Sequence, residues 1–289
     1  MGHLLPIWER LPDNIKGTIN PHHTNRTLLV AGYADVKRFP GNRYIYVEHG
    51  AGQSYIGIDK AIAPYYSGGH GHRNAVGFIC PTTESADRWR TSFPETPVTA
   101  VGSPYLDPFY GRQPDPRTVT ITFHWNALFT GVPETASAFS FYAPHLLDVV
   151  TRWKQQGWHV IGHNHPRYAA VRQFWTRSEM RDAGVEYVPD YATVVERSAV
   201  IVADNTTAQA DFLSLGRGVV WLNHPSYRRD VEHGGRYWTW TTLGGSSINT
   251  PQDLAHLNLA DLSPPSGDPY AHADGNASER AASFVSSVA

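Results

Sequence analysis

The alternation of strand-like and helix-like segments between residues 118 and 222 constrains the fold more than any other feature of the sequence. The strand-like segments are short and rich in β-branched residues, and the segments between them carry apolar residues at helical spacing. The predicted strands are 118–125, 158–162, 185–190, 199–205 and 218–224, and the predicted helices are 143–157, 167–184, 191–198 and 206–216. This strict alternation predicts a parallel sheet covered by helices on both faces.

The first part of the chain alternates less regularly and predicts a smaller α/β domain. Its predicted strands are 27–33, 43–49, 75–81 and 97–104, and its clearest helix is 82–93, with Thr82 or Thr83 as the N-cap. The Pro- and Gly-rich stretch 107–117 separates the two parts. We therefore expect an N-terminal domain at 1–110 and a C-terminal domain at 111–289 that closes in a short helix near 277–288.

Composition excludes several classes of protein. Lys and Arg number 24 against 26 Asp and Glu, giving a net charge of −2, which disfavours binding of a polynucleotide through many phosphate contacts. Cys80 is the single cysteine, so neither an internal disulfide nor a cysteine-based zinc site is expected. No apolar run approaches the ~18 residues of a transmembrane helix, and no signal peptide is recognisable. We expect a cytoplasmic protein without a transmembrane segment.

Polar residues, several of them histidines, follow the predicted strands at their carboxyl ends. In open parallel sheets, ligands bind beyond those ends. The residues are His49 after strand 43–49, His124 and Asn126 after 118–125, His163 and His165 after 158–162, and Asp204, Asn205, Thr206 and Thr207 after 199–203.

The stretch VADNTTAQADF at 202–212 indicates an anion site. Free backbone N–H groups, two threonine hydroxyls and the positive end of a helix dipole meet there. The plainer interpretation is that Asn205 or Thr206 only caps the helix. Together with the other strand ends, we favour phosphate binding.

His49 admits two interpretations. In one it is a histidine in a glycine turn that bonds to the backbone; in the other it is a general base with a pKa near neutrality. A metal site is disfavoured, because the His-x-His of 163–165 has no third ligand at a familiar spacing. The chain also lacks Gly-x-Ser-x-Gly and phosphate-loop motifs. We expect no metal and no cofactor.

The motifs, taken in order, resemble a known family. They are EHGAGQ (48–53), GSPYLD (102–107), TFHWN (122–126), HNHP (163–166) and the block at 196–222. This series is similar to the CDP-glycerol glycerophosphotransferase family of teichoic-acid primases and polymerases. The resemblance implies an α/β, GT-B-like fold, with two Rossmann-like parallel-sheet domains facing a central cleft.

The resemblance also implies roles for the residues. His49 would be the base for the acceptor hydroxyl, His165 and the two threonines would bind the donor's diphosphate, and Asp204 would fix the turn. The candidate site contains His49 and His165 as catalytic residues; Asp204, Asn205, Thr206, Thr207, Gln209 and His163 as donor-phosphate ligands; and Gly50, Gly52, Gln53, His124, Asn126 and Gly102 in the cleft.

Three positions depart from the family pattern. His163 stands in place of a lysine, and Asn126 and Tyr105 stand in place of arginines. Arg167, Arg228, Arg229 or Arg236 could supply charge instead. We expect a transferase that moves a sugar or polyol-phosphate group from a CDP-, UDP- or GDP-linked donor to an acceptor hydroxyl. The alternatives are a nucleotide-sugar epimerase or hydrolase, a catalytically degenerate nucleotide- or sugar-binding protein and, more distantly, a metal-dependent hydrolase.

Overall fold

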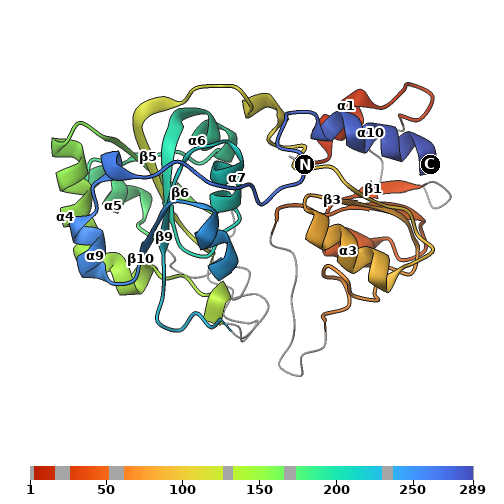
Figure 1. The fold of residues 1–289 in the computed structure, drawn as a ribbon, viewed down its shortest axis with the longest axis horizontal. Helices are drawn as coiled ribbons and strands as arrows, with labels where there is room; N and C mark the ends of the chain where they lie inside the picture. The colour runs from red at the N-terminus through yellow and green to blue at the C-terminus, as the bar shows by residue number, and fades with distance from the viewer. Residues whose placement is uncertain are drawn as a thin grey trace. The chain divides into compact units, whose positions relative to one another are not determined.

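The chain forms two compact units. The computed structural model describes residues 3–16, 27–51, 62–125, 133–165, 174–229 and 237–288. Unit 1 comprises Met1–Tyr110 together with Pro269–Ala289, and unit 2 comprises Gly111–Asp268. Both contain a parallel sheet with helices on its faces (Figure 1). The predicted α/β class with two parallel-sheet domains is therefore confirmed.

Unit 2 contains a sheet of six parallel strands in the order β10-β9-β8-β5-β6-β7. The strands are β5 (Asp115–Phe123), β6 (His159–Asn164), β7 (Glu186–Tyr187), β8 (Ser198–Ala203), β9 (Gly218–Leu222) and β10 (Ser246–Ile248). The helices are α4 (Phe139–Gln155), α5 (Arg177–Asp182), α6 (Tyr191–Arg197), α7 (Ala208–Ser214) and α9 (Pro251–His256), and 3₁₀ turns span Pro133–Thr135, Thr241–Leu243 and Leu259–Asp261. Strand β10 and helix α9 are additions that the sequence analysis did not predict.

The core of unit 2 explains the predicted periodicities. Central strand β5 is buried from Thr118 to Phe123, as expected for a strand covered on both faces. Helix α4 buries one apolar stripe at intervals of three and four residues, formed by Tyr142, Leu146, Val149, Val150 and Trp153. Full burial of each such side chain contributes roughly 1.5–3 kcal/mol relative to exposure.

Unit 1 contains a sheet of four parallel strands in the order β1-β2-β3-β4. They are β1 (Leu28–Val30), β2 (Tyr44–Val47), β3 (Ala75–Cys80) and β4 (Val98–Ala100), with helices α1 (Leu5–Arg10), α2 (Tyr33–Arg38), α3 (Thr83–Ser92) and α10 (Ala277–Val288), and a 3₁₀ turn at Asp107–Phe109. Thr82 is the N-cap of α3, because its hydroxyl oxygen accepts a hydrogen bond of 3.0 Å from Ser85 N. The capping prediction for this helix is confirmed.

Strand β2 supplies both faces of the unit 1 sheet. Ile45 and Val47 belong to one apolar cluster, with Ile7 of α1 and Val285 of α10. Tyr44 and Tyr46 belong to another, with Trp89 of α3. Helices α1 and α10 therefore cover one face and α3 the other, as Figure 1 shows.

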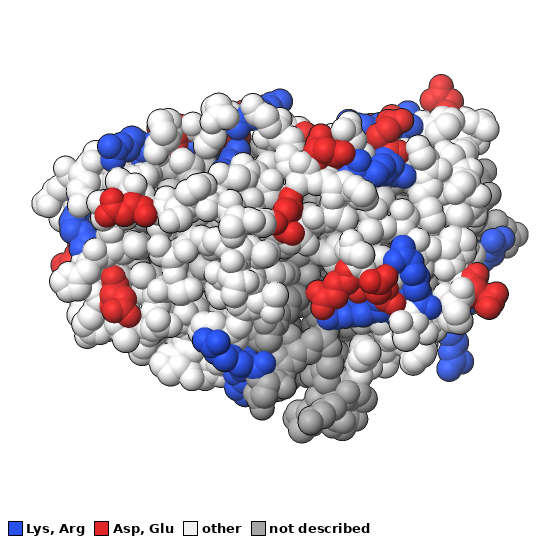
Figure 2. Space-filling model, viewed as in Figure 1, with Lys and Arg blue, Asp and Glu red and all other residues white. Residues whose placement is uncertain are grey.

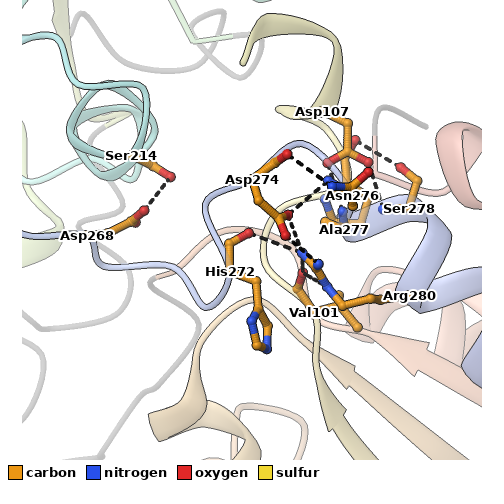
Figure 3. A network of polar contacts seen from close by, with 11 residues as sticks. Val101, Asp107, Ser214, Asp268, His272, Asp274, Asn276, Ala277, Ser278 and Arg280 are labelled. Carbon is orange, nitrogen blue, oxygen red and sulfur yellow. Dashed lines mark hydrogen bonds and ion pairs between the residues drawn. The ribbon is translucent and has the colours of Figure 1, made fainter. Parts of the chain in front are cut away.

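The end of the chain returns to unit 1. The carboxylate of Asp107 accepts hydrogen bonds from Ala277 N at 3.0 Å and Ser278 N at 2.7 Å, at the start of α10 (Figure 3). Arg280 on the same helix donates to Val101 O at 2.9 Å and to Asp274 at 2.8 Å. These bonds place residues 269–289 in unit 1, which corrects the prediction that they belong to the second domain.

Gly102 has a structural role that differs from its predicted place in the cleft. Its φ of 91° lies in the left-handed region that favours glycine. A Cβ atom there would lie 2.4 Å from Ala271 O, so the backbone of the C-terminal segment closes over this residue. Gly102 is buried under that segment.

Charged residues are interspersed on the face of the molecule in Figure 2, where neither sign forms one continuous area. On α3, Arg88 pairs with Glu84 and Arg90 with Asp87, both at 2.6 Å. Among the described residues, no helix is both long enough and apolar enough to span a membrane. That the chain does not bind polynucleotides stays a prediction.

Replacing Asp107 with alanine should destabilise unit 1, because two N–H groups at the start of α10 lose their acceptor. We expect the free energy of unfolding to fall by about 1–2 kcal/mol, measured by chemical denaturation. Asp13→Ala is the matched control, because the Asp13 side chain is fully exposed. Equal effects of the two substitutions would show that Asp107 does not hold α10.

Candidate functional site

Three neighbouring strands of unit 2 end at the same level. Thr122 of β5 is paired with His163 of β6 on one side and with Ala203 of β8 on the other. The carboxyl ends of these strands therefore lie side by side along one edge of the sheet, which we call the carboxyl edge of unit 2. It comprises residues 123–125, 164–165 and 204–207. The register brings His124, His165 and Asp204 to this edge, as the sequence predicted.

Asp204 holds the carboxyl edge together from within. Its side chain is fully buried, at 0% exposure. One carboxylate oxygen accepts from His124 N at 2.6 Å and the other from Ala138 N at 2.8 Å, so the residue joins the end of β5 to the start of α4. Burial raises its pKa from 3.8 to about 7. Asp204 is thus a buried support, which corrects its prediction as a phosphate ligand.

Gln209 and Asn205 also support the turn. Gln209 is fully buried, and its amide donates to Ala203 O at 2.8 Å while its oxygen accepts from Thr206 N at 3.3 Å. The side-chain amide of Asn205 donates to Glu134 O at 2.8 Å. Both amides bond to the protein's own backbone, so these two residues are not placed as the phosphate ligands that were predicted.

The two threonines are the polar side chains of this turn that reach the surface. Thr206 is half-buried and Thr207 is exposed. Thr207 is the N-cap residue of α7, yet its side chain makes no capping hydrogen bond. Capping by Thr206 is weak, because its hydroxyl lies 3.5 Å from Ala208 N. Helix capping alone therefore does not account for the threonine pair.

The two histidines at the carboxyl end of β6 have different surroundings. His163 is buried, and its Nδ1 donates to Val188 O at 2.9 Å. Burial lowers its pKa, so it is neutral near pH 7 and does not replace the cationic lysine of the family pattern. His165 is half-buried and stacks on Trp125, with ring centroids 6.1 Å apart. Of the pair, His165 lies where a ligand of the carboxyl edge could reach it.

Glu134 is a member of this site that the sequence analysis missed. It is fully buried and accepts three bonds from Arg228, namely from the backbone N at 2.6 Å, Nε at 3.0 Å and Nη2 at 2.9 Å. Burial alone would raise the pKa of Glu134, but the bonds from Arg228 outweigh that effect and lower it. The charge of Arg228 is therefore balanced inside the protein. Glu134 is the only Asp, Glu, Lys or Arg between residues 118 and 147. A single charged residue in so long an uncharged stretch could have indicated a special role from the sequence.

His49 lies in unit 1, just after β2, and is half-buried. Its Nδ1 bonds to Ala31 O. Because a carbonyl oxygen only accepts, the proton is on Nδ1 and the lone pair is on Nε2, which is the tautomer of a base. Gly50 follows with a φ of 74°, in the left-handed region that favours glycine. The predicted cleft residues Gly52, Gln53 and Asn126 lie outside the described residues, as do Arg167 and Arg236.

A hollow of about 330 Å³ in unit 2 lies away from these residues. It is lined by residues at the amino ends of the strands, including Arg117, Trp158 and Gly218. Within the described ranges, no three His, Cys, Asp or Glu side chains gather as ligands for a metal ion.

No protein-family model matches the sequence, and no curated protein matches it. Solved structures do match. The wall teichoic acid polymerase TagF is similar with a TM-score of 0.57 and 15% identity, over 91% of this chain and 72% of that chain. A TagF variant soaked with CDPG is similar with a TM-score of 0.55 and 13% identity, over 91% of this chain and 72% of that chain. The UDP-GlcNAc 2-epimerase from Neisseria meningitidis, bound to UDP-GlcNAc, is similar with a TM-score of 0.50 and 14% identity, over 90% of this chain and 76% of that chain.

These similarities establish the fold. The chain has the GT-B-like architecture of TagF and of UDP-GlcNAc 2-epimerases, and the structural resemblance expected from the motifs is confirmed. Both kinds of neighbour are enzymes. At such low sequence identity, structural similarity shows the fold but not the reaction, which depends on the residues of the site.

Replacing Asp204 with asparagine should destabilise unit 2, because both oxygens of the carboxyl group can accept from a backbone N–H even when it is protonated. The amide nitrogen of asparagine cannot accept, so one of the two bonds is lost. We expect the free energy of unfolding to fall by about 1–3 kcal/mol at pH 5. Asp182→Asn, at an exposed position on α5, is the control and should change it by less than about 0.5 kcal/mol.

Comparison of wild type with Asp204→Asn also tests the raised pKa of Asp204. Between pH 4 and about 7 the folded state holds this proton more tightly than the unfolded state, so the contribution of Asp204 to stability falls as pH rises. The stability difference between wild type and Asp204→Asn should shrink from pH 5 to pH 8. A difference that stays constant over this range would contradict the assignment.

Proposed function

We propose that this protein is a transferase that moves a sugar or polyol-phosphate group from a nucleotide-diphosphate donor to an acceptor hydroxyl. The observation that carries the proposal is the carboxyl edge of unit 2, where three level strand ends present Thr206, Thr207 and His165. Ligands of open parallel sheets bind at such edges. The GT-B-like fold supports the proposal, since TagF has been soaked with CDPG and an epimerase of this fold is bound to UDP-GlcNAc.

The donor is assigned to unit 2. Its diphosphate would accept hydrogen bonds from the hydroxyls of Thr206 and Thr207 and from the backbone at the start of α7. His165 would donate to the same phosphate group. Since His163 is neutral and Arg228 is paired with Glu134, most of the stabilisation would come from hydrogen bonds within the rigid turn.

The acceptor is assigned to unit 1, with His49 as the general base. The acceptor O–H bond breaks and the proton passes to Nε2 of His49. The oxygen's electron pair forms the new bond to the transferred group, and the bond from that group to the departing nucleotide breaks, with its electron pair leaving on the nucleotide phosphate. A base with a pKa near neutrality suits this proton transfer.

A nucleotide-sugar epimerase or hydrolase is the second candidate, favoured by the shared fold of the epimerase bound to UDP-GlcNAc. It would use the carboxyl edge of unit 2 without a separate acceptor. Consumption of a nucleotide-sugar in the absence of any acceptor would favour this candidate over the transferase. The cytoplasmic location expected from the sequence stays a prediction.

A thermal-shift screen of CMP, CDP, UDP, GDP, ADP and dTDP tests the donor site. A diphosphate at about 100 times its Kd adds roughly 2.7 kcal/mol, which raises Tm by several degrees for a protein of this size. We expect a shift that depends on the base and is lost in the double variant Thr206→Val/Thr207→Val.

The matched control for that screen is Thr241→Val/Thr242→Val. This second threonine pair lies just before β10, at the amino end of the unit 2 strands, so its replacement should leave the nucleotide shift intact. The absence of a shift with every nucleotide would remove the transferase proposal.

Replacing His49 with alanine should lower turnover by about 10²–10⁴-fold, the usual contribution of a general base. The nucleotide-induced thermal shift should stay at its wild-type value, because the donor is assigned to unit 2. His70→Ala, an exposed histidine in the same unit, is the control and should retain activity. Unchanged turnover in His49→Ala would remove the assigned role.

A further inference from the structure

Two further side chains lie beside His49 in unit 1, and neither was assigned a role from the sequence. The ring of His3 lies 5.9 Å from that of His49 and 5.5 Å from that of Tyr105, measured between centroids. The three rings come from separate segments: the residues before α1, the end of β2 and the loop after β4. A cluster assembled from three such segments is a product of the fold, not of local sequence.

Packing of α1 fixes the place of His3. Ile7 and Leu11 are buried in the same apolar cluster as Val47 of β2 and Val101, which follows β4. The residues before α1 are thereby placed near the ends of those strands. The ring of Tyr105 packs against Phe109, with the two ring centroids 5.9 Å apart.

The spacing of the two imidazoles suits a shared oxygen atom. A hydrogen bond between a ring nitrogen and a hydroxyl oxygen spans roughly 2.7–3.0 Å. Two imidazoles with centroids 5.9 Å apart can therefore each bond to one oxygen between them.

We propose that His3 is an acceptor-binding residue, which donates a hydrogen bond to the hydroxyl oxygen whose proton passes to Nε2 of His49. This inference rests on the proposed function, because it assumes that unit 1 holds the acceptor. His3 exchanges no proton in the step, and its bond orients the oxygen toward the base. The ligand class is a small polyhydroxyl compound.

The charge states agree with this role. Burial lowers the pKa of His3 to about 3, and the neighbouring His49 adds to the effect. His3 is therefore neutral near pH 7, with one N–H to donate. A neutral His3 also avoids charge repulsion when His49 takes up the proton.

Nuclear magnetic resonance of ¹⁵N-histidine-labelled protein tests the proposal, with glycerol as the probe hydroxyl compound. In wild type, glycerol should shift the ring signals of His3 and His49 together. His3→Phe keeps a ring against His49 and Tyr105 but removes both nitrogens. In that variant the glycerol concentration at half-maximal shift of His49 should rise at least tenfold, and His3→Gln should recover part of the loss.

Several outcomes would overturn the proposal. If glycerol shifts the ring signals of His49 alone, or of neither histidine, the two rings do not share an oxygen. The same conclusion follows if the glycerol concentration at half-maximal shift of His49 is unchanged in His3→Phe. His70→Phe is the control for adding an aromatic ring to unit 1 and should behave as wild type. The result is independent of the donor site, because absent nucleotide binding would reject the transferase while leaving the glycerol titration to decide the role of His3.

Discussion

The carboxylate of Asp204 is the interaction on which the carboxyl edge of unit 2 depends. A buried carboxyl group is costly unless hydrogen bonds compensate its loss of contact with water. Here both oxygens are used, one by the backbone at the end of β5 and one by the backbone at the start of α4. Asp204 thereby joins two segments, the end of β5 and the start of α4, to the turn that follows β8. The threonines that follow Asp204 are therefore carried on a turn whose position is fixed from beneath.

The structure distinguishes residues whose side chains are buried from residues whose side chains are accessible, and two histidines show the difference. His163 and His49 each use Nδ1 to bond to a backbone carbonyl, of Val188 and Ala31 respectively. The bond fixes the same tautomer in both rings. His163 is buried at 6% exposure, whereas His49 is half-buried. Exposure, and not the hydrogen bond, decides which of them can serve a reaction.

Much of the fold could be predicted from the sequence because its causes are local. Buried strands such as β5 and β8 appear as β-branched runs, and the apolar stripe of α4 has helical spacing. The start of α4 was placed at residue 143 instead of Phe139, because Ala138 offers no side-chain cap and the residue that bonds its backbone N–H, Asp204, is 66 positions away. No local pattern contains that information.

The site was predicted less completely for the same reason. The sequence indicated which strands end in polar residues, and the register confirmed that three of these ends, those of β5, β6 and β8, lie side by side in unit 2. It could not distinguish buried His163 from half-buried His165, because that depends on where Val188 O and Tyr191 lie. Nor could it show the partnership of Glu134 with Arg228 or the approach of His3 to His49, since each joins segments far apart in the chain.

The return of residues 269–289 to unit 1 makes unit 2 an insertion within unit 1, with consequences for the order of folding. During synthesis the strands of unit 1 emerge first, but the face formed by Ile45 and Val47 lacks the part of its cover that α10 supplies. Unit 2 is continuous in the chain and can fold as a unit before α10 exists. Unit 1 is therefore synthesised first but completed last. One face of its sheet is fully covered only after Val285 and the rest of α10 have been synthesised.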